Sequence, residues 1–205
     1  GGASLVDGEG TRRAIRVING VTATVLRFTL QNGFDSFQGA GIFNTGALTM
    51  TNSTIRANVT SGDGGGIFNV SGGTLTLNNS IVSGNIGTGI FNACDGGDIT
   101  LNSSTISHNS TGGGGGGIVG ICDSGLIILN DSAILNNTAH TGGGIWAFAT
   151  ITLNRSSVSG NLANQAHGGG IYSEGGLISN NSTISSNQAQ GFGGGIYHGQ
   201  GGLFL

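Results

Sequence analysis

A run of glycines followed by isoleucine recurs along the whole chain at a nearly constant interval. Five copies read Gly-Gly-Gly-Ile, and two looser copies end at Ile42 and Ile90. Ile15 starts the series as a degenerate copy. The isoleucines are Ile15, Ile42, Ile67, Ile90, Ile118, Ile145, Ile171 and Ile196. From Ile42 onward they are separated by 25, 23, 28, 27, 26 and 25 residues. A fixed period of this length is the signature of a repeat protein, in which each repeat buries its apolar face against its neighbours.

A second block of eleven residues recurs out of phase with the first and contains no insertions, so its columns align directly. Position one is always Leu or Ile, position six is always Ser, position eight is Ile or Val, and position eleven is always Asn. The closing asparagines are Asn58, Asn85, Asn109, Asn137, Asn161 and Asn187. Alternation at positions one and three, and again at six and eight, indicates two short strands separated by a tight corner. Asn, which tolerates a left-handed backbone, is frequent at that corner.

Each repeat therefore contains three short strands, one after the glycines and two within the second block. This organisation predicts an all-β chain folded as a right-handed parallel β-helix of about eight coils, each of roughly 26 residues. Residues 1–205 are expected to form a single β-helix domain, and because the chain ends within a repeat we expect a piece of a longer protein. The Ile, Leu and Val columns should line the interior with the Ser column beside them. The closing asparagines should form a ladder of side-chain amides from coil to coil.

Composition excludes several other classes of protein. The 44 glycines occur without proline and without the three-residue period of collagen. Lysine is absent, charged residues make up 7% of the chain, and the net charge is −3, so a nucleic-acid partner is not expected. No apolar run reaches the roughly 20 residues of a membrane span.

The GGxI element, together with the aliphatic-x-x-Asn ending of the second block, as in Ile55-Arg-Ala-Asn58, resembles repeats of bacterial surface β-helix proteins. The chlamydial polymorphic outer-membrane proteins, with paired GGA-aliphatic and Phe-x-x-Asn motifs, are one such family. This chain has Ile or Val where those repeats have Phe, and a third Gly where they have Ala. The resemblance implies a β-helix with the pectin-lyase-like superfamily fold and an extracellular or cell-surface location of the bacterial type.

The two cysteines occupy equivalent places in adjacent repeats, since Cys94 follows Ile90 by four residues and Cys122 follows Ile118 by four. One rung of about 4.8 Å lies within the Cα separation that a disulfide needs. We therefore predict a Cys94–Cys122 disulfide and an oxidising compartment. The alternative is a pair of free thiols that stack by coincidence.

No catalytic residues are assigned. Asp95 and Asp123 each follow the isoleucine of their repeat by five residues. With Asp98 nearby, their carboxylates are the candidate ligands for a Ca²⁺ ion. Hydrophilic turn residues are the favoured interpretation, so no metal and no cofactor are expected. The sequence favours a non-catalytic protein without closing the question of enzymatic activity.

Two columns are expected to point outward. The residues that follow the isoleucines are aromatic in six of seven repeats, which predicts a binding stripe for sugars or a partner, or alternatively rings that stack on one another beneath the glycine loops. They are Phe43, Phe68, Phe91, Trp146, Tyr172 and Tyr197. A second column resembles the threonine arrays of ice-binding solenoids, but its two Ile and its Asn neighbours disfavour that function. It contains Thr49, Thr76, Thr100, Ile128, Thr152 and Ile178.

We therefore expect a non-catalytic extracellular β-solenoid that serves as a structural fibre, a stalk or an adhesin. Its expected partners are neighbouring copies, surface glycans or surface proteins. The alternative is a polysaccharide-binding or polysaccharide-degrading protein, because enzymes of the pectin-lyase-like superfamily share this fold and fold alone does not decide activity.

Overall fold

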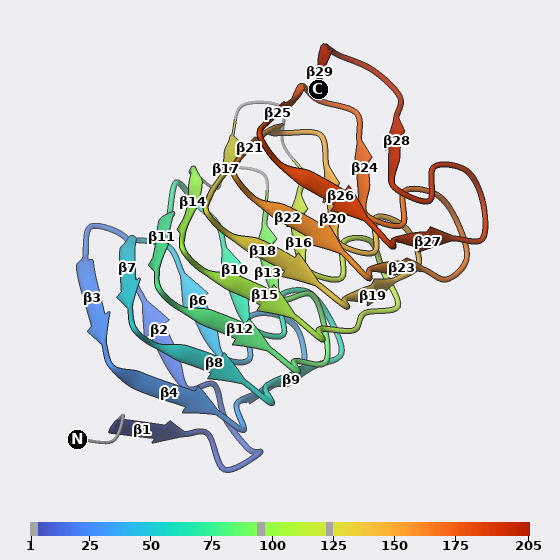
Figure 1. Ribbon diagram of the computed structural model, residues 1–205. Helices are drawn as coiled ribbons and strands as arrows, with labels where there is room; N and C mark the ends of the chain where they lie inside the picture. The colour runs from blue at the N-terminus through green and yellow to red at the C-terminus, as the bar shows by residue number, and fades with distance from the viewer. Residues whose placement is uncertain (1–3, 94–96, 122–124) are drawn as a thin grey trace.

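The computed structural model describes residues 4–93, 97–121 and 125–205. The chain winds into stacked coils that form a parallel β-helix, with the N-terminal coils at one end and the C-terminal coils at the other (Figure 1). Three parallel sheets of eight strands run along its length. The predicted all-β parallel β-helix of about eight coils is confirmed.

The first sheet, which we call the isoleucine sheet, holds the strands that follow the glycines. It comprises β2 (Ile15–Val17), β6 (Ile42–Asn44), β10 (Ile67–Asn69), β13 (Ile90–Asn92), β16 (Ile118–Gly120), β20 (Ile145–Ala147), β24 (Ile171–Ser173) and β28 (Ile196–His198). Its isoleucines pair in register from coil to coil, including Ile15 with Ile42.

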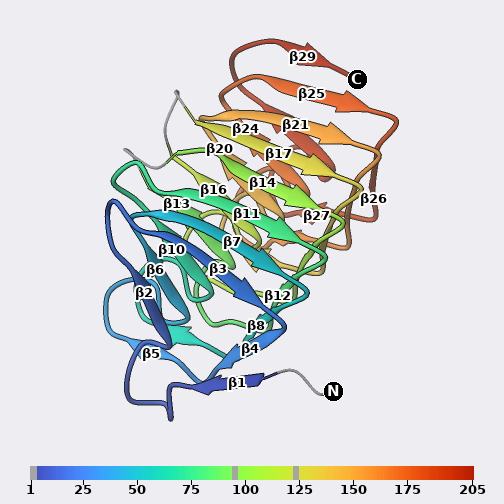
Figure 2. The ribbon, with the colours of Figure 1, turned by 90° about the vertical axis from the view of Figure 1, so that its left-hand side faces the viewer.

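The second sheet, the leucine sheet, holds the first strand of the eleven-residue block. It comprises β3 (Thr22–Leu26), β7 (Ala47–Thr51), β11 (Thr74–Asn78), β14 (Ile99–Asn102), β17 (Leu126–Asn130), β21 (Thr150–Asn154), β25 (Leu177–Asn180) and β29 (Leu203–Phe204). In Figure 2 this sheet faces the viewer, with its strands side by side.

The third sheet, the serine sheet, holds the second strand of the same block. It comprises β1 (Ser4–Asp7), β4 (Phe28–Gln31), β8 (Thr54–Arg56), β12 (Ile81–Ser83), β15 (Thr105–Ser107), β18 (Ala133–Leu135), β22 (Ser157–Ser159) and β26 (Thr183–Ser185).

Some coils add a short fourth strand after the closing position, which is Gly33 in the first of them and asparagine in the others. The sequence pattern did not predict these strands. These strands are β5 (Phe34–Asp35), β9 (Val59–Thr60), β19 (Thr138–Ala139), β23 (Leu162–Ala163) and β27 (Gln188–Ala189). They are only two residues long and lack an alternating pattern, so periodicity carried no signal for them.

The core consists of four apolar columns, two from the leucine sheet and one from each of the other two sheets. Ile67, Leu75, Leu77 and Val82 represent one coil of it, and each is at most 1% exposed. Left-handed residues turn the chain between the leucine and serine sheets, as predicted for this corner: φ is 50° at Asn52 and 47° at Asn79. Asp131 and Arg155 occupy the same position in later coils with φ of 49° and 48°.

The closing asparagines form the predicted ladder in the interior, which we call the inner Asn ladder. Oδ1 of Asn109 accepts hydrogen bonds from the backbone N–H and from Nδ2 of Asn85, at 3.1 Å and 2.8 Å. Asn109 in turn donates its N–H and its Nδ2 to Oδ1 of Asn137, both at 3.0 Å. The same pair of hydrogen bonds, from a backbone N–H and from Nδ2 to one Oδ1, repeats between the other members of the ladder. The buried members are 0 to 1% exposed. The buried side-chain amides of this ladder therefore find hydrogen-bond partners in the neighbouring coils.

The Ser column also lies inside, where each hydroxyl links two coils. Oγ of Ser104 accepts the N–H of Ser80 at 3.0 Å and donates to the carbonyl of Asn102 at 2.9 Å. The hydroxyls therefore bond to backbone groups and not to one another. Both recurring polar residues of the block serve the stacking of coils.

Candidate functional site

The aromatic column lies on the outer side of the isoleucine sheet, as strand alternation requires. Its rings stack along the axis: the centroids of Phe43 and Phe68 are 5.5 Å apart, and those of Phe68 and Phe91 are 5.3 Å apart. Phe68 is only 3% exposed and Phe91 only 8%. With Val119 they form a second apolar cluster, separate from the core.

The glycine loops explain this burial. A Cβ added at Gly114 would lie 2.3 Å from the Trp146 ring, and one added at Gly39 would lie 3.0 Å from Cβ of Phe68. The loops therefore pack directly against the column, which the absence of side chains permits. Of the two alternatives that the sequence left open, the structure has the second at Phe68 and Phe91: their rings stack on neighbouring rings beneath the glycine loops. A role for this column in binding remains a prediction for the half-buried Trp146, Tyr172 and Tyr197.

The C-terminal part of the column gathers further polar and aromatic groups. Tyr197 stacks on Tyr172 and on His167, with both centroid distances at 4.9 Å. Nδ1 of His167 accepts the backbone N–H of Phe192 at 2.7 Å. The hydroxyl of Tyr172 donates to Glu174, and this bond raises the pKa of Tyr172 to about 12. No single motif in the sequence signalled this cluster, because its members come from two different coils.

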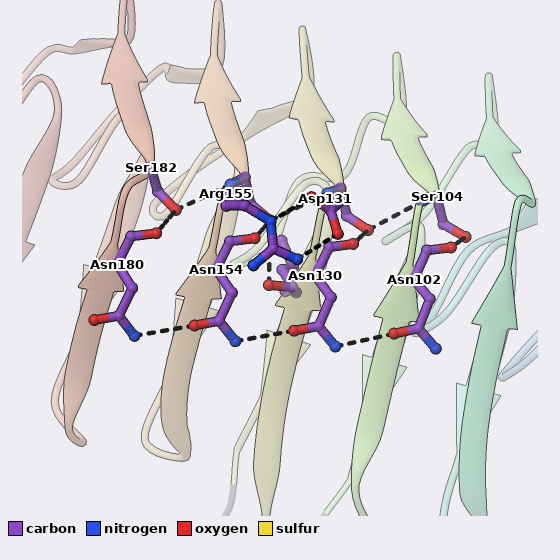
Figure 3. A network of polar contacts seen from close by, with 11 residues as sticks. Asn102, Ser104, Asn130, Asp131, Asn154, Arg155, Asn180 and Ser182 are labelled. Atoms are coloured by element: carbon purple, nitrogen blue, oxygen red, sulfur yellow. Dashed lines mark hydrogen bonds and ion pairs between the residues drawn. The ribbon is translucent and has the colours of Figure 1, made fainter.

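The outer face of the leucine sheet is the second candidate surface. Outward asparagines at the end of its strands form a second ladder, the outer Asn ladder, which Figure 3 shows from Asn102 to Asn180. Each Nδ2 donates to Oδ1 of the preceding coil at 2.9 to 3.0 Å. The members are Asn78, Asn102, Asn130, Asn154 and Asn180. The sequence placed asparagine here as a corner residue and did not predict the ladder.

An ion pair lies beside the outer Asn ladder at the same corner. Nε and Nη2 of Arg155 donate to the two carboxylate oxygens of Asp131, both at 2.7 Å (Figure 3). The hydrogen bond from Arg155 holds the pKa of Asp131 below its ordinary value. Both side chains are exposed, so the pair adds little to stability and marks a solvated corner.

Of the acidic residues considered for calcium, only Asp98 lies in the described part of the chain. Asp98 is exposed, and its Oδ1 accepts the backbone N–H of Leu126 from the next coil at 3.0 Å. Asp95, Asp123 and both cysteines of the predicted disulfide, Cys94 and Cys122, lie outside the described residues. Within the described ranges, no group of three or more His, Cys, Asp or Glu residues could hold a metal ion.

The first coil is tied to the second by an arginine. Arg13 donates to Oδ2 of Asp35 and to the carbonyls of Gln38 and Gly39, at 2.6 to 2.7 Å. Its guanidinium also lies 4.8 Å from the centroid of Phe43 and so covers the N-terminal end of the aromatic column. Burial raises the pKa of Asp35, but the N–H groups of Gln38 and Phe37 and the Arg13 guanidinium outweigh it, so that the pKa lies below its ordinary value.

This arrangement predicts that Asp35 makes the protein more stable at neutral pH than in acid. Because the pKa of Asp35 is lower in the folded than in the unfolded chain, the unfolded chain binds more protons and stability rises with pH. The contribution is complete above the unfolded pKa of about 3.9 and is lost as pH falls through the lower folded pKa. Urea unfolding at a series of acidic pH values should give a shallower pH dependence for Asp35→Asn than for the wild type. If the free energy of unfolding of the two proteins changed with pH in parallel, the interactions of the Asp35 carboxylate would contribute nothing to the pH dependence of stability.

The fold and these columns define the class of the chain, which is a parallel β-helix repeat protein. Residues 176–199, one coil of the rod, match the Chlamydia polymorphic membrane protein (Chlamydia_PMP) repeat. No curated protein and no solved structure matches the chain. None of the described segments forms a helix that is long and apolar enough to cross a membrane.

Proposed function

We propose that this chain is the rod of a surface-exposed protein of the outer-membrane type, and that the rod is a non-catalytic stalk that acts in adhesion. The observation that carries the proposal is the match of one coil to the polymorphic membrane protein repeat, combined with the recurrence of that coil in register along the rod. What holds for the matched coil in its architecture therefore extends to its neighbours.

The use of the recurring polar residues supports a scaffold. Inner asparagines and serines bond to the next coil and leave no buried polar group facing a substrate at these positions. Glycine loops cover the middle of the aromatic column, and the ladders repeat without interruption. Repetition of this kind lengthens a rod, whereas a catalytic centre depends on residues that differ from one coil to the next.

Surface display and adhesion are tested together in cells that carry the whole protein. Antibody raised against residues 4–205 should label intact cells, and purified rod coated on beads should bind host cells saturably. Lack of labelling on intact cells, with labelling after lysis, would overturn the surface assignment. Labelling without any binding would leave a stalk and refute the adhesin.

The enzymatic alternative is addressed by incubating the purified rod with acidic polysaccharides, with and without Ca²⁺. We expect no unsaturated product and no new reducing ends. Product that forms with the wild type and disappears when Asp95, Asp98 or Asp123 is replaced by Asn would contradict the non-catalytic proposal.

A further inference from the structure

The two tyrosines of the chain lie on neighbouring rungs of the aromatic column. Tyr172 is the middle residue of β24 and pairs in register with Tyr197, the middle residue of β28. Their rings stack with the centroids 4.9 Å apart and the planes 18° apart. Because parallel strands in register send both side chains in the same direction, equivalent edges of the two rings lie side by side.

The hydroxyl edges of both rings face a small space beside Glu174. Both tyrosines are half-buried, so part of each ring is open to solvent. A Cβ added at Gly199 would lie 3.4 Å from Cγ of Glu174 and 3.9 Å from Cε1 of Tyr197. Cε1 is one of the two ring carbons next to the hydroxyl-bearing carbon. This edge of Tyr197 therefore lies near the carboxylate that holds the hydroxyl of Tyr172.

The phenol of Tyr172 is hydrogen-bonded to a group that accepts a proton. Its hydroxyl donates to Oε1 of Glu174, and this bond is the main cause that raises the pKa of Tyr172 to about 12. The phenol is therefore protonated at neutral pH and does not react as a phenolate. When an electron leaves the ring, the hydroxyl becomes a strong acid, and its proton passes along the existing hydrogen bond to the carboxylate.

We propose that Tyr172 and Tyr197 form an oxidative cross-linking site, at which a carbon–carbon bond joins their rings and Glu174 accepts the phenolic proton of Tyr172. The oxidant is hydrogen peroxide used by a haem peroxidase, which removes one electron and one proton from each phenol. The two radicals couple at ring carbons beside the hydroxyls. The hydrogens on these carbons then move to the oxygens, which restores both phenols. The protein loses two hydrogen atoms in total, and one peroxide is reduced to two waters.

Other stacked rings of the column lack one of the two requirements. Phe43 and Phe68 stack in the same way, but they have no hydroxyl and form no phenoxyl radical. Trp146 pairs in register with Tyr172, but its ring packs edge-on against Phe148, with an angle of 67° between the planes. The tyrosine pair alone combines an oxidisable phenol with a stacked phenol on the next rung.

The cross-link would fasten the coil that holds β28 to the coil that holds β24. It closes a loop of 25 residues, because Tyr197 follows Tyr172 by that number of positions. A link of this kind restricts the unfolded chain as a disulfide does, and so raises the midpoint of thermal unfolding. Contact with peroxide outside the cell rests on the proposed surface location, whereas the reactivity of the pair is a property of the fold.

The test treats the purified 205-residue chain with hydrogen peroxide and a haem peroxidase at low protein concentration. Dityrosine fluorescence and peptide mapping by mass spectrometry detect the cross-link, and denaturing gels separate monomers from dimers. The matched control combines Tyr172→Phe with Phe37→Tyr, which keeps two tyrosines in the chain. Phe37 is 76% exposed and lies about six rungs from Tyr197, or roughly 29 Å along the rod. Thermal unfolding before oxidation establishes that the variants fold.

We expect the wild type to give a monomer that is lighter by two hydrogen atoms, with the peptides of Tyr172 and Tyr197 joined. The double variant should form an intramolecular cross-link at least about tenfold more slowly, because its tyrosines are not held together. Equal rates for the two proteins, dimers as the main product, or a cross-link from Trp146 instead would overturn the proposed site.

The role of the carboxylate has its own variant. Glu174→Gln keeps a carbonyl that accepts the hydrogen bond of Tyr172 but removes the base, so coupling should slow at least about tenfold. A Glu174→Gln chain that couples as fast as the wild type would overturn the assignment of Glu174 as proton acceptor. Coupling in the purified chain does not depend on where the protein is displayed, so its failure is distinct from a failure of surface labelling or adhesion.

Discussion

Replacement of Asn109 by alanine is expected to lower the free energy of unfolding by about 4 kcal/mol, since several buried groups lose their partners at once. The backbone N–H and the Nδ2 of Asn85 both lose the Oδ1 acceptor of Asn109. The carbonyl of Val82 and Oδ1 of Asn137 each lose a donor. Because Asn109 is 0% exposed, water does not replace these bonds without opening the rod. Equilibrium unfolding in urea measures the loss.

Asn102 is the matched control for this prediction, because it lies in the same coil and belongs to the outer Asn ladder. The hydrogen bonds of its side-chain amide to Asn78 and Asn130 are made at the surface, where water replaces them. Asn102→Ala should therefore cost less than about 1 kcal/mol. Equal losses for the two variants would mean that the inner ladder has no special role in stability.

Gly116→Ala should destabilise the rod by about 3 kcal/mol or more, which is at or above the usual cost of overpacking. A Cβ on Gly116 would lie 2.5 Å from the carbonyl oxygen of Gly143 and 2.7 Å from that of Thr138. Both atoms are backbone of the next coil, so neither moves without separating two coils. The backbone of Gly116 has no positive φ, so the effect comes from close approach alone.

The control for this substitution lies in the same run of six glycines. A Cβ on Gly112 would meet no atom within 4 Å, and its φ is not positive. Gly112→Ala should leave stability unchanged or raise it by up to about 1 kcal/mol, since alanine restricts the unfolded chain. Thermal unfolding of the two variants compares them directly. If both alanines were tolerated, the close stacking of glycine loops would be refuted.

The sequence predicts the features that repeat in every coil. The Ile, Leu and Val columns, the inner Asn ladder, the inward serines and the left-handed corner at positions such as Asn52 all follow from alternation and from residue chemistry. Arg155 adopts the corner as well, although arginine is not a residue that favours a left-handed backbone. The strands on both sides of it pair in register with the neighbouring coil, which holds the corner in place.

The features that the sequence did not predict depend on how loops fold back on the rod. Alternation correctly placed Phe68 on the outer side of its strand, but it did not decide between an exposed ring and one beneath a glycine loop, because a loop of glycines has no periodicity that reveals its path. A third ladder joins Asn44, Asn69 and Asn92 in only three coils, so its column was too short to stand out. The predicted disulfide between Cys94 and Cys122 remains a prediction.

The residues that recur in every coil serve the stacking of the coils, so the function of the rod is expected on its outer faces. Glycine, asparagine and serine recur because the stacking of coils requires them, and none of them marks a site. The chemistry that distinguishes one such rod from another must lie on its outer faces, such as the leucine sheet and the exposed end of the aromatic column.

Exchange of side-chain amide protons tests the central claim most directly, because it reports on each asparagine separately. In ¹⁵N-labelled protein, the Nδ2 protons of Asn85, Asn109 and Asn137 should exchange with deuterium as slowly as the backbone amides of the core. The Nδ2 protons of Asn102 and Asn130 should exchange much faster, since they lie at the surface. Equal exchange in the two sets would contradict a rod held together by a buried ladder.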